Sequence, residues 1–338
     1  MRRPWLAPFV PLYVAGAALR ARMQTQQRLS WPVVSIGNLS TGGSGKTPLA
    51  IYLAQQLTQR GFAVDVLSRG YGRASSAAAK VDVKGSAEQY GDEPLLIARA
   101  AGVPVYVAPR RYDAGMMAEQ TLQEQGSISR IQGPRAHILD DGFQHRKLHR
   151  DVDVLLLSDE DLDDSLLPAG NLREALNTIA RASVIAIPAD SPRIEGYLLD
   201  PVAIDRNSEE PQFIGPIWRV RRQMEVPPLM GPAFAFCGIA KPEQFFAGLR
   251  NAGVELAETE SFRDHHTYSM IDLADMARAA HAYGATALIT TEKDAARLGD
   301  LAASLPHALP LVTARLTIAI EDEATAIEWL VARLRTKG

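Results

Sequence analysis

A glycine-rich run near the amino terminus carries the clearest chemistry in this sequence. It reads Ser40-Thr41-Gly42-Gly43-Ser44-Gly45-Lys46-Thr47. In such a loop successive backbone N–H groups point at phosphate oxygens, the lysine reaches the β- and γ-phosphates, and the last hydroxyl binds Mg²⁺. The usual pattern begins with glycine where this chain has Ser40, which leaves that chemistry intact. The run predicts a site for a nucleoside triphosphate and Mg²⁺, the alternative being a glycine-rich turn with an incidental lysine.

A second chemical signal is a pair of adjacent acids, Asp140 and Asp141, that ends the apolar run from His137. A phosphate loop needs a carboxylate at the end of a neighbouring buried strand, which holds the metal directly or through water. Two neighbouring carboxylates repel each other and resist desolvation unless a cation is present. We therefore expect Asp140 and Asp141 to hold Mg²⁺ together with Thr47. The alternative is a solvated acidic turn.

Short β-branched runs that alternate with helical stretches would position these groups. Candidate strands cover 33–36, 64–67, 103–107, 136–139, 152–157 and 184–187. Most are continuous apolar runs, as expected for strands buried on both faces. Pro48 lies near the start of the helix that follows the first strand, Leu49, Leu53 and Leu57 repeat along it, and Gly61 ends it. The pattern predicts an α/β fold of the P-loop NTPase type, a mostly parallel sheet with helices on both faces.

The polar, proline-bearing stretch 190–212 indicates a linker. Beyond it, candidate strands at 213–220, 234–238 and 286–290 and helices at 242–251 and 271–283 predict a second, smaller α/β unit. We therefore expect an amino-terminal hydrophobic segment at 1–28, a P-loop core at 29–204, and a smaller α/β domain at 205–338. The alanine- and serine-rich stretch 74–79 is expected to be a mobile surface loop.

The amino-terminal segment is apolar between basic residues. Residues 4–19 carry no charge, whereas Arg2, Arg3, Arg20 and Arg22 flank them. About 16 helical residues cover about 24 Å, which is less than a hydrocarbon core of about 30 Å, and prolines shorten the helix further. A spanning helix is therefore disfavoured.

Three other interpretations of this segment remain. A basic start, an apolar middle and Ala15-Gly16-Ala17 are typical of a cleaved signal peptide. Alternatively, the helix could pack on the protein's own body. We favour insertion into one face of a membrane, with Trp5, Phe9, Leu12 and Tyr13 at the acyl boundary and the arginines among anionic headgroups.

Composition excludes several classes of protein. The 338 residues are 46% hydrophobic and 22% charged, and the formal net charge of −3 comes without blocks of basic residues. Nucleic acid is therefore not an expected partner. The single cysteine, Cys237, lies in an apolar run, so one chain can form neither a disulfide nor a cysteine-based zinc site. A buried thiol in a reducing compartment is expected.

With these elements in place, the sequence resembles the tetraacyldisaccharide 4′-kinase family, the lipid A 4′-kinases, over almost its whole length. The motifs that carry the resemblance are Gly37-Asn38-Leu39-Ser40, Ser68-Arg69-Gly70-Tyr71-Gly72, Gly91-Asp92-Glu93-Pro94, Asp140-Asp141-Gly142-Phe143-Gln144-His145, Leu167-Pro168-Ala169-Gly170-Asn171-Leu172-Arg173-Glu174, Phe262-Arg263-Asp264-His265-His266 and Thr291-Glu292-Lys293-Asp294. Each motif is modest alone, but the ordered set is specific. Ser40 at the first loop position is typical of this resemblance.

The resemblance implies a catalytic dyad. Transfer to a sugar hydroxyl needs a base close to the γ-phosphate. Asp92 is the candidate, and His265 is implied as its partner across the cleft, with His266 as the alternative. By sequence alone, Asp92 before Glu-Pro would be a helix cap. The two histidines alone would suggest a metal-ligand pair or a polar turn, although Mg²⁺ prefers oxygen ligands.

Other roles follow from the same resemblance. Arg173 and Glu174 are implied to line the nucleotide and phosphate site, where a planar guanidinium suits the charge on the transferring group. The alternative is a charged pair at the start of a helix. His145 is implied to hold the substrate's phosphate or to stabilise the transition state, unless it is structural. Lys293-Asp294 resembles a nucleotide-base recognition motif.

The resemblance thus implies an ATP-dependent kinase. It would phosphorylate the 4′-hydroxyl of tetraacyldisaccharide 1-phosphate to form lipid IVA in lipid A biosynthesis, at the cytoplasmic face of a bacterial inner membrane, with no obligate protein partner. Two rivals are a P-loop GTPase or ATPase of the metallochaperone or targeting type and a membrane-associated nucleotide-binding scaffold. The GTPase or ATPase class needs no apolar amino-terminal segment, and the scaffold gives Asp92 and the two histidines no role.

Overall fold

A computed structural model describes residues 3–22, 25–42, 45–126, 133–199 and 213–336. These residues build one 12-stranded sheet in the order β10-β9-β11-β12-β8-β7-β6-β1-β5-β2-β4-β3. All pairings are parallel except β12 with β8 and β3 with β4. The mostly parallel α/β sheet predicted from the sequence is confirmed.

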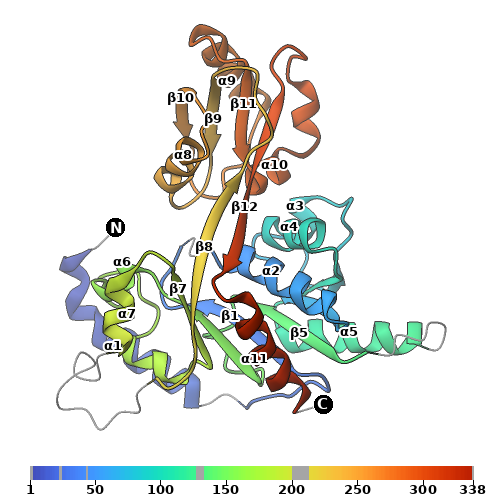
Figure 1. The fold of residues 1–338 in the computed structure, drawn as a ribbon, viewed down its shortest axis with the longest axis vertical. Coiled ribbons are helices and arrows are strands. Elements are labelled where there is room, and N and C mark those ends of the chain that lie inside the picture. The colour runs from blue at the N-terminus through green and yellow to red at the C-terminus, as the bar shows by residue number, and fades with distance from the viewer. Residues whose placement is uncertain (1–2, 23–24, 43–44, 127–132, 200–212, 337–338) are drawn as a thin grey trace.

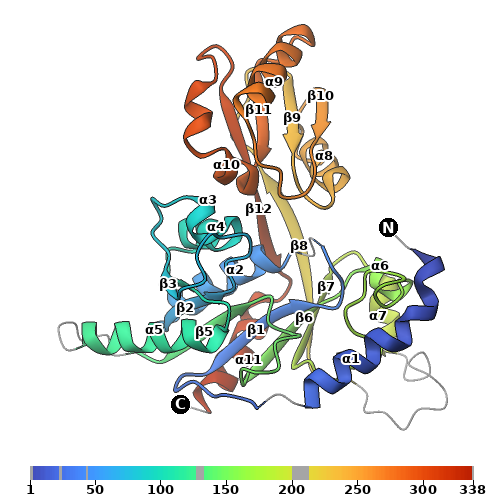
Figure 2. The same ribbon diagram turned by 180° about the vertical axis from the view of Figure 1, so that it is seen from behind.

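The larger part of the fold holds the first seven strands, and Figures 1 and 2 show it as the wider body of the molecule. Its strands are β1 (Val33–Asn38), β2 (Ala63–Ser68), β3 (Ala79–Lys80), β4 (Val105–Val107), β5 (Arg135–Asp140), β6 (Val152–Leu156) and β7 (Val184–Pro188). Its helices are α2 (Lys46–Gln59), α3 (Ala87–Tyr90), α4 (Asp92–Ala101), α5 (Arg111–Gly126), α6 (Asp159–Leu162) and α7 (Pro192–Leu199). We call this body the large unit. The six strands predicted here are present, with ends that differ by one or two residues.

Helices cover both faces of this sheet because successive strand residues point in opposite directions. Ile138 of β5 packs in one core with Leu53 of α2 and Leu95 of α4. Its neighbour Leu139 packs in another core with Ala114 of α5. The continuous apolar strands of the sequence therefore have the two buried faces that were predicted.

A smaller body, the small unit, holds β9 (Ala233–Cys237), β10 (Leu256–Ser261) and β11 (Ala287–Thr291). Its helices are α8 (Pro242–Asn251), α9 (Met270–Ala282) and α10 (Glu292–Leu298). Two long strands, β8 (Ile217–Glu225) and β12 (Leu311–Ile320), run between the two bodies (Figure 1). They pair with each other in antiparallel fashion, and β8 also pairs with β7, so one sheet passes through both units.

The chain ends in the large unit. After β12, helix α11 (Glu323–Arg335) lies against the large unit (Figure 2). Its residues Ile327 and Leu330 are fully buried in the core that contains Val34 of β1. The segment predicted as a smaller carboxy-terminal domain thus ends in a helix that packs on the P-loop core.

The prediction of a linker at 190–212 is wrong for part of this stretch. Residues Pro192–Leu199 form α7, whose Ile194 and Leu198 are buried one turn apart beside β7. Polar residues and prolines on the solvent side concealed this apolar stripe. The remainder, 200–212, and with it the boundary predicted at 204/205, lies outside the described residues.

The amino-terminal segment is helical, with a 3₁₀ turn at Pro4–Phe9 followed by α1 (Val10–Arg22). It lies on the outer side of the large unit, beside α6 and α7 (Figures 1 and 2). Trp5 and Leu12 are 73% and 70% exposed, and Phe9 is also exposed. Tyr13 instead faces the protein, where its hydroxyl donates to the Arg173 carbonyl at 3.0 Å. Among the described helices none is long and apolar enough to cross a membrane.

Candidate active site

The phosphate loop lies between β1 and α2, as the sequence predicted. Gly45 caps α2 in a left-handed conformation with φ of 89°, which explains the need for glycine there. Helix α2 begins at Lys46, two residues before Pro48, and Thr47 is buried in its first turn. The N-terminal N–H groups of a helix favour an anion at this position. Gly43 and Ser44, which belong to the same loop, lie outside the described residues.

The acidic pair lies beside this loop because β5 is the direct neighbour of β1. The register pairs Ile36 with Asp140, so both strands end at the same edge of the sheet. Lys46 Nζ is 3.5 Å from Asp141 Oδ1 and donates to Asn38 Oδ1 at 2.9 Å. Lys46 therefore lies beside Asp141, at the edge of the sheet where the sequence placed the acids.

Arg173 reaches the same place by backbone pairing with the phosphate loop. Thr41 N donates to Asn171 O at 2.8 Å, and Arg173 N donates to Leu39 O at 2.7 Å. Ser40 forms an isolated bridge with Leu172 in the same segment. The Arg173 Nη1 atom then lies 3.1 Å from each carboxylate oxygen of Asp141. Arg173, Lys46 and Asp141 thus form one ion cluster at the loop.

Glu174 does not join this cluster. Its carboxylate pairs with Arg146 at 3.3 Å and with Arg181. Both partners are cations outside the loop, so the contacts of Glu174 are those of an ion pair that secures the segment carrying Arg173.

The pKa values of the two adjacent carboxyl groups are shifted in opposite directions. Burial, with the negative charges of Glu93 and Asp141, raises the pKa of Asp140. Burial would also raise the pKa of Asp141, but Lys46 and Arg173 hold it below its usual value. Asp140 is 2% exposed, and its Oδ1 has no hydrogen-bond partner in the described part of the chain. A buried carboxylate oxygen that lacks a partner beside a phosphate loop fits a bound cation.

This donor set suits Mg²⁺ rather than a metal held by protein side chains alone. Across the described ranges, no group of three or more His, Cys, Asp or Glu side chains is arranged to hold a metal ion. Mg²⁺ is commonly held by one or two carboxylates together with substrate phosphates and water. Thr47, Asp140 and Asp141 are the residues that fit it here.

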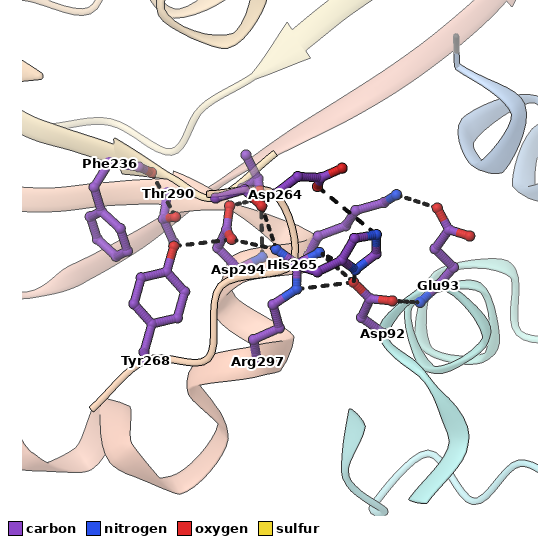
Figure 3. Close-up of polar contacts among 12 residues, drawn as sticks. Asp92, Glu93, Phe236, Asp264, His265, Tyr268, Thr290, Asp294 and Arg297 are labelled. Carbon is purple, nitrogen blue, oxygen red and sulfur yellow. Dashed lines mark hydrogen bonds and ion pairs between the residues drawn. The ribbon is translucent and has the colours of Figure 1, made fainter. Parts of the chain in front are cut away.

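Asp92 and His265 meet between the two units (Figure 3). Asp92 is the first residue of α4 and is buried, while His265 belongs to the loop after β10. His265 Nδ1 lies 3.2 Å from Asp92 Oδ2. Asp92 is not the helix cap that its position suggested, because Gly91 takes that place and Asp92 Oδ1 accepts from Glu93 N at 3.0 Å.

His265 is the member of the histidine pair that faces Asp92. It has a φ of 59°, and its side chain is 42% exposed. The ring of exposed Tyr71 lies 5.8 Å away. His266 points elsewhere: it stacks on Phe262 at 4.7 Å and contacts Asp272 at 3.2 Å.

Sequence reasoning missed Arg297, which contacts the dyad. Its Nε donates to Asp92 Oδ2 at 3.0 Å. One turn earlier on α10, Lys293 pairs with Glu93, so both acids of the Asp92-Glu93 motif meet cations of the small unit. The spacing of Lys293 and Arg297 on a helix was the available signal. Asp294 is fully buried in this network, which removes it from base recognition.

The same contacts determine the charges of the dyad. Burial would raise the pKa of Asp92, but the hydrogen bond from His265 and the charge of Arg297 hold it well below its usual range. The Asp92 hydrogen bond, against the effect of burial, raises the pKa of His265. Asp92 is therefore an anion, and His265 is the more basic of the two groups.

His145 lies four residues beyond Asp141. Burial, with the charges of Arg111 and Arg150, lowers its pKa to about 4. At neutral pH His145 is an uncharged imidazole in a basic surrounding, which can donate a hydrogen bond to an anion. Arg111 is itself buried, and its Nε has no hydrogen-bond partner among the described residues.

Comparison with known proteins supports the family resemblance found in the sequence. The sequence profile of the tetraacyldisaccharide-1-P 4′-kinase family, LpxK, matches residues 2–335. A tetraacyldisaccharide 4′-kinase of Koribacter versatilis is 40% identical over 96% of this chain and 97% of its own length. The kinase of Aquifex aeolicus is 37% identical over 80% and 84%. A crystal structure of LpxK from Aquifex aeolicus in complex with ATP matches with a TM-score of 0.72 and 31% identity, over 97% of this chain and 98% of that one. This chain belongs to the tetraacyldisaccharide 4′-kinase family.

Proposed function

We propose that this protein transfers the γ-phosphate of ATP to the 4′-hydroxyl of tetraacyldisaccharide 1-phosphate, giving ADP and lipid IVA. Family membership supports the activity, and the relatives carry it in their names. One observation carries the proposal in this chain: Asp92 and His265, from the two units, meet at the start of α4, a helix that packs on α2 directly after the phosphate loop. Glu93, next to Asp92, is close enough to Asp140 to raise its pKa.

The phosphate loop supplies the electrostatic part of the reaction. Lys46 and Arg173 would contact the phosphates, where charge spreads over the transferring group in the transition state. Thr47, Asp140 and Asp141 would hold Mg²⁺, which neutralises phosphate charge when bound. A neutral His145 would donate a hydrogen bond to a phosphate oxygen. Because transfer is in line, no phosphoenzyme is required.

We assign the role of base to His265 rather than to Asp92. Asp92 is buried, and its carboxylate accepts hydrogen bonds from Glu93 N, Arg297 and His265. A carboxylate stabilised in this way is a weak base. His265 is partly exposed, and Asp92 raises its basicity, so its Nε2 atom can take the proton of the sugar hydroxyl. Asp92 would then orient the ring and stabilise its charged form.

The rival functions are less well supported. A metallochaperone or targeting GTPase would share the phosphate loop, but the family match over almost the whole chain favours the kinase. A non-enzymatic scaffold gives no role to the contact between Asp92 and His265.

The lipid substrate implies work at a membrane surface. We infer that Trp5, Phe9 and Leu12 enter one face of the bilayer, because they are large, apolar and exposed on one short helical segment. Because the reaction uses ATP, the proposed location of the site is the cytoplasmic side of a bacterial inner membrane. No nucleic acid and no obligate protein partner is proposed.

A transfer assay tests the proposal. Purified full-length protein is incubated with γ-labelled ATP, Mg²⁺ and tetraacyldisaccharide 1-phosphate in detergent micelles, and we expect label in the lipid. Lys46→Ala should lose at least about 10²-fold in rate, because it removes the phosphate cation. The matched control is Lys84→Ala at an exposed lysine. Failure to label lipid in any detergent, with ATP still bound, would contradict the proposal, and a preference for GTP without lipid transfer would favour the GTPase.

A further inference from the structure

Arg297 of α10 lies against both members of the Asp92–His265 pair (Figure 3). Its Nε donates to Asp92 Oδ2 at 3.0 Å, and its Nη2 contacts the same oxygen. The Nη2 atom also lies 3.2 Å from His265 Nδ1. Only 8% of the Arg297 side chain is exposed, so these contacts are made away from bulk water.

The other edge of the guanidinium is anchored inside the small unit. Arg297 Nη1 donates to the Gly238 carbonyl at 2.6 Å and to Asp294 Oδ1 at 2.9 Å. The same Gly238 carbonyl accepts from the backbone N–H of His265 at 3.1 Å. Arg297 therefore joins the Asp92 side chain to the backbone that carries His265.

The Asp294 side chain is itself held by buried hydrogen bonds. Asp294 is fully buried and accepts from the Tyr268 hydroxyl at 3.0 Å and from the Thr291 hydroxyl at 2.6 Å. A planar guanidinium can serve Asp92, Gly238 and Asp294 together because its donors diverge in fixed directions. A lysine ammonium is a single point and cannot span the same set.

We propose that Arg297 is a positioning residue of the kinase reaction, which holds the Asp92 carboxylate of the large unit in register with the His265 loop of the small unit. This inference rests on the proposed function, since it takes the Asp92–His265 pair as the reacting base. It adds a residue that does not touch the reacting atoms and acts through both members of the pair.

The charge of Arg297 gives this role a distinct signature. His265 faces Asp92 on α4, Arg297 on α10, Asp264 on its own loop at 3.9 Å, and the Tyr71 ring. The Asp92 hydrogen bond raises the pKa of His265, whereas Arg297 lowers it. Removing the Arg297 charge therefore raises the pKa of His265 and keeps the base protonated to higher pH.

The test measures kcat against pH for Arg297→Met and Arg297→Lys, together with the titration of the His265 ring by NMR, assigned with His265→Ala. For Arg297→Met we expect the acid limb of kcat and the ring titration to move upward by about one pH unit. The plateau kcat should fall about 10- to 10²-fold because the pair is misaligned. Arg297→Lys should keep the limb near its native position and still lose kcat.

Lys293→Met is the matched control, because it removes the neighbouring ion pair to Glu93 without a contact to His265. In this variant the acid limb of the kcat–pH profile and the titration of the His265 ring should stay at their native positions. The inference would be overturned if the acid limb of the kcat–pH profile and the His265 ring titration did not move in Arg297→Met. If Arg297→Met does not fold, a native kcat in Arg297→Lys would overturn it. Absence of lipid phosphorylation by the native protein would instead overturn the proposed function. The titration of the His265 ring would then still show whether Arg297 acts on His265.

Discussion

At the scale of single residues, two carboxylates next to each other in the chain have different surroundings. Asp141 is compensated by Lys46 and Arg173, whereas Asp140 keeps an oxygen without a partner in the described structure. Under the proposed function both carboxylates would bind the cation, and Asp141 would also hold the phosphate-binding side chains in place. The two members of the dyad also differ in their surroundings: Asp92 is held by hydrogen bonds, whereas His265 is accessible to solvent.

The dyad predicts a shift in the pH dependence of catalysis. Asp92→Asn keeps the shape of the side chain but removes its charge, so the pKa of His265 falls. A base with a lower pKa is deprotonated at lower pH, and the acid limb of kcat should move downward. The plateau should fall about 10²- to 10⁴-fold. The measurement is kcat over a pH series at saturating ATP and lipid.

Three controls accompany this prediction. The double variant Asp92→Asn/His265→Ala should be little worse than the worse single variant, because the pair acts as a unit. His266→Ala should retain most activity. Multiplicative losses, or a larger loss at His266 than at His265, would show that the wrong groups have been paired, and lost ATP binding in Asp92→Asn would assign that carboxylate to the metal site.

At the scale of elements, the amino-terminal helix predicts a membrane contact separable from the fold. We expect Trp5→Ser/Phe9→Ser/Leu12→Ser to weaken binding to anionic vesicles and to raise the KM for lipid more than that for ATP. The three side chains are exposed, and each would lose the proposed contact with acyl chains, while Tyr13 keeps its hydrogen bond to the Arg173 carbonyl. Vesicle co-sedimentation and steady-state kinetics measure both effects.

The control for this helix is Met230→Ser, which changes a fully exposed apolar residue in the small unit. It should leave vesicle binding unchanged. Equal vesicle binding by the triple variant and the native protein would contradict a membrane role for the helix.

A second element-scale feature is a buried charge cluster that ties α5 to the sheet. His137 of β5 is fully buried, with Nδ1 2.7 Å from Asp65 and Nε2 3.4 Å from Glu119. Glu119 also accepts from the N–H groups of Ser30 and Trp31 at 2.6 and 3.1 Å. The cluster thus fixes the chain just before β1, the strand that leads to the phosphate loop.

This cluster predicts that stability falls at alkaline pH. Burial would lower the pKa of His137, but Asp65 and Glu119 raise it to about 9. Because the folded pKa exceeds the unfolded value of about 6.5, the stabilisation is complete below pH 6.5 and is lost as pH rises through 9. The free energy of unfolding should fall by about 2 to 3 kcal/mol between pH 6.5 and 9.5. Urea denaturation at the two pH values measures it.

His137→Gln should remove this pH dependence and destabilise the protein, since two carboxylates lose a buried partner at a cost of about 3 to 5 kcal/mol. His281→Gln, at an exposed histidine of α9, should behave as the native protein. Equal stability of the native protein at both pH values would refute the charged state of His137.

At the scale of the whole molecule, the chain leaves the large unit, builds the small unit and returns. Strands β8 and β12 connect the two, and the contacts of α10 with Asp92 and Glu93 join them again at the candidate active site. The dyad therefore forms only when the two units are held in this arrangement.

Because α11 packs in the core of the large unit, a substitution in this helix should destabilise the large unit. Leu330→Ala on α11 should lower the free energy of unfolding by about 2 to 5 kcal/mol, because it leaves a cavity in the core shared with β1. Hydrogen exchange should speed up in β1 and α2 more than in β9. Leu273→Ala, in the core of the small unit, should give the reverse pattern. Exchange changes confined to the small unit in Leu330→Ala would contradict this assignment.

The sequence by itself determined the features that are local in the chain. A strand, a glycine-rich loop and a helix follow one another within 33–59, so β1, the phosphate loop and α2 could be predicted from spacing alone. The acids at the end of β5 were predictable in the same way, because parallel strands end at a common edge. The prediction was wrong at α7, where Ile194 and Leu198 give too short an apolar stripe to outweigh proline and polar neighbours.

Tertiary structure alone decided the contacts that complete the site. Asp92 and Arg297 are 205 residues apart in sequence, and no local pattern marks such a pair. The difference between His265 and His266 depends on the left-handed backbone at His265, which turns adjacent side chains toward different partners. Arg173 reaches Asp141 through pairing of its backbone with the phosphate loop. Local propensities act over a few residues, whereas these contacts depend on how the two units pack, and packing is a property of the whole chain.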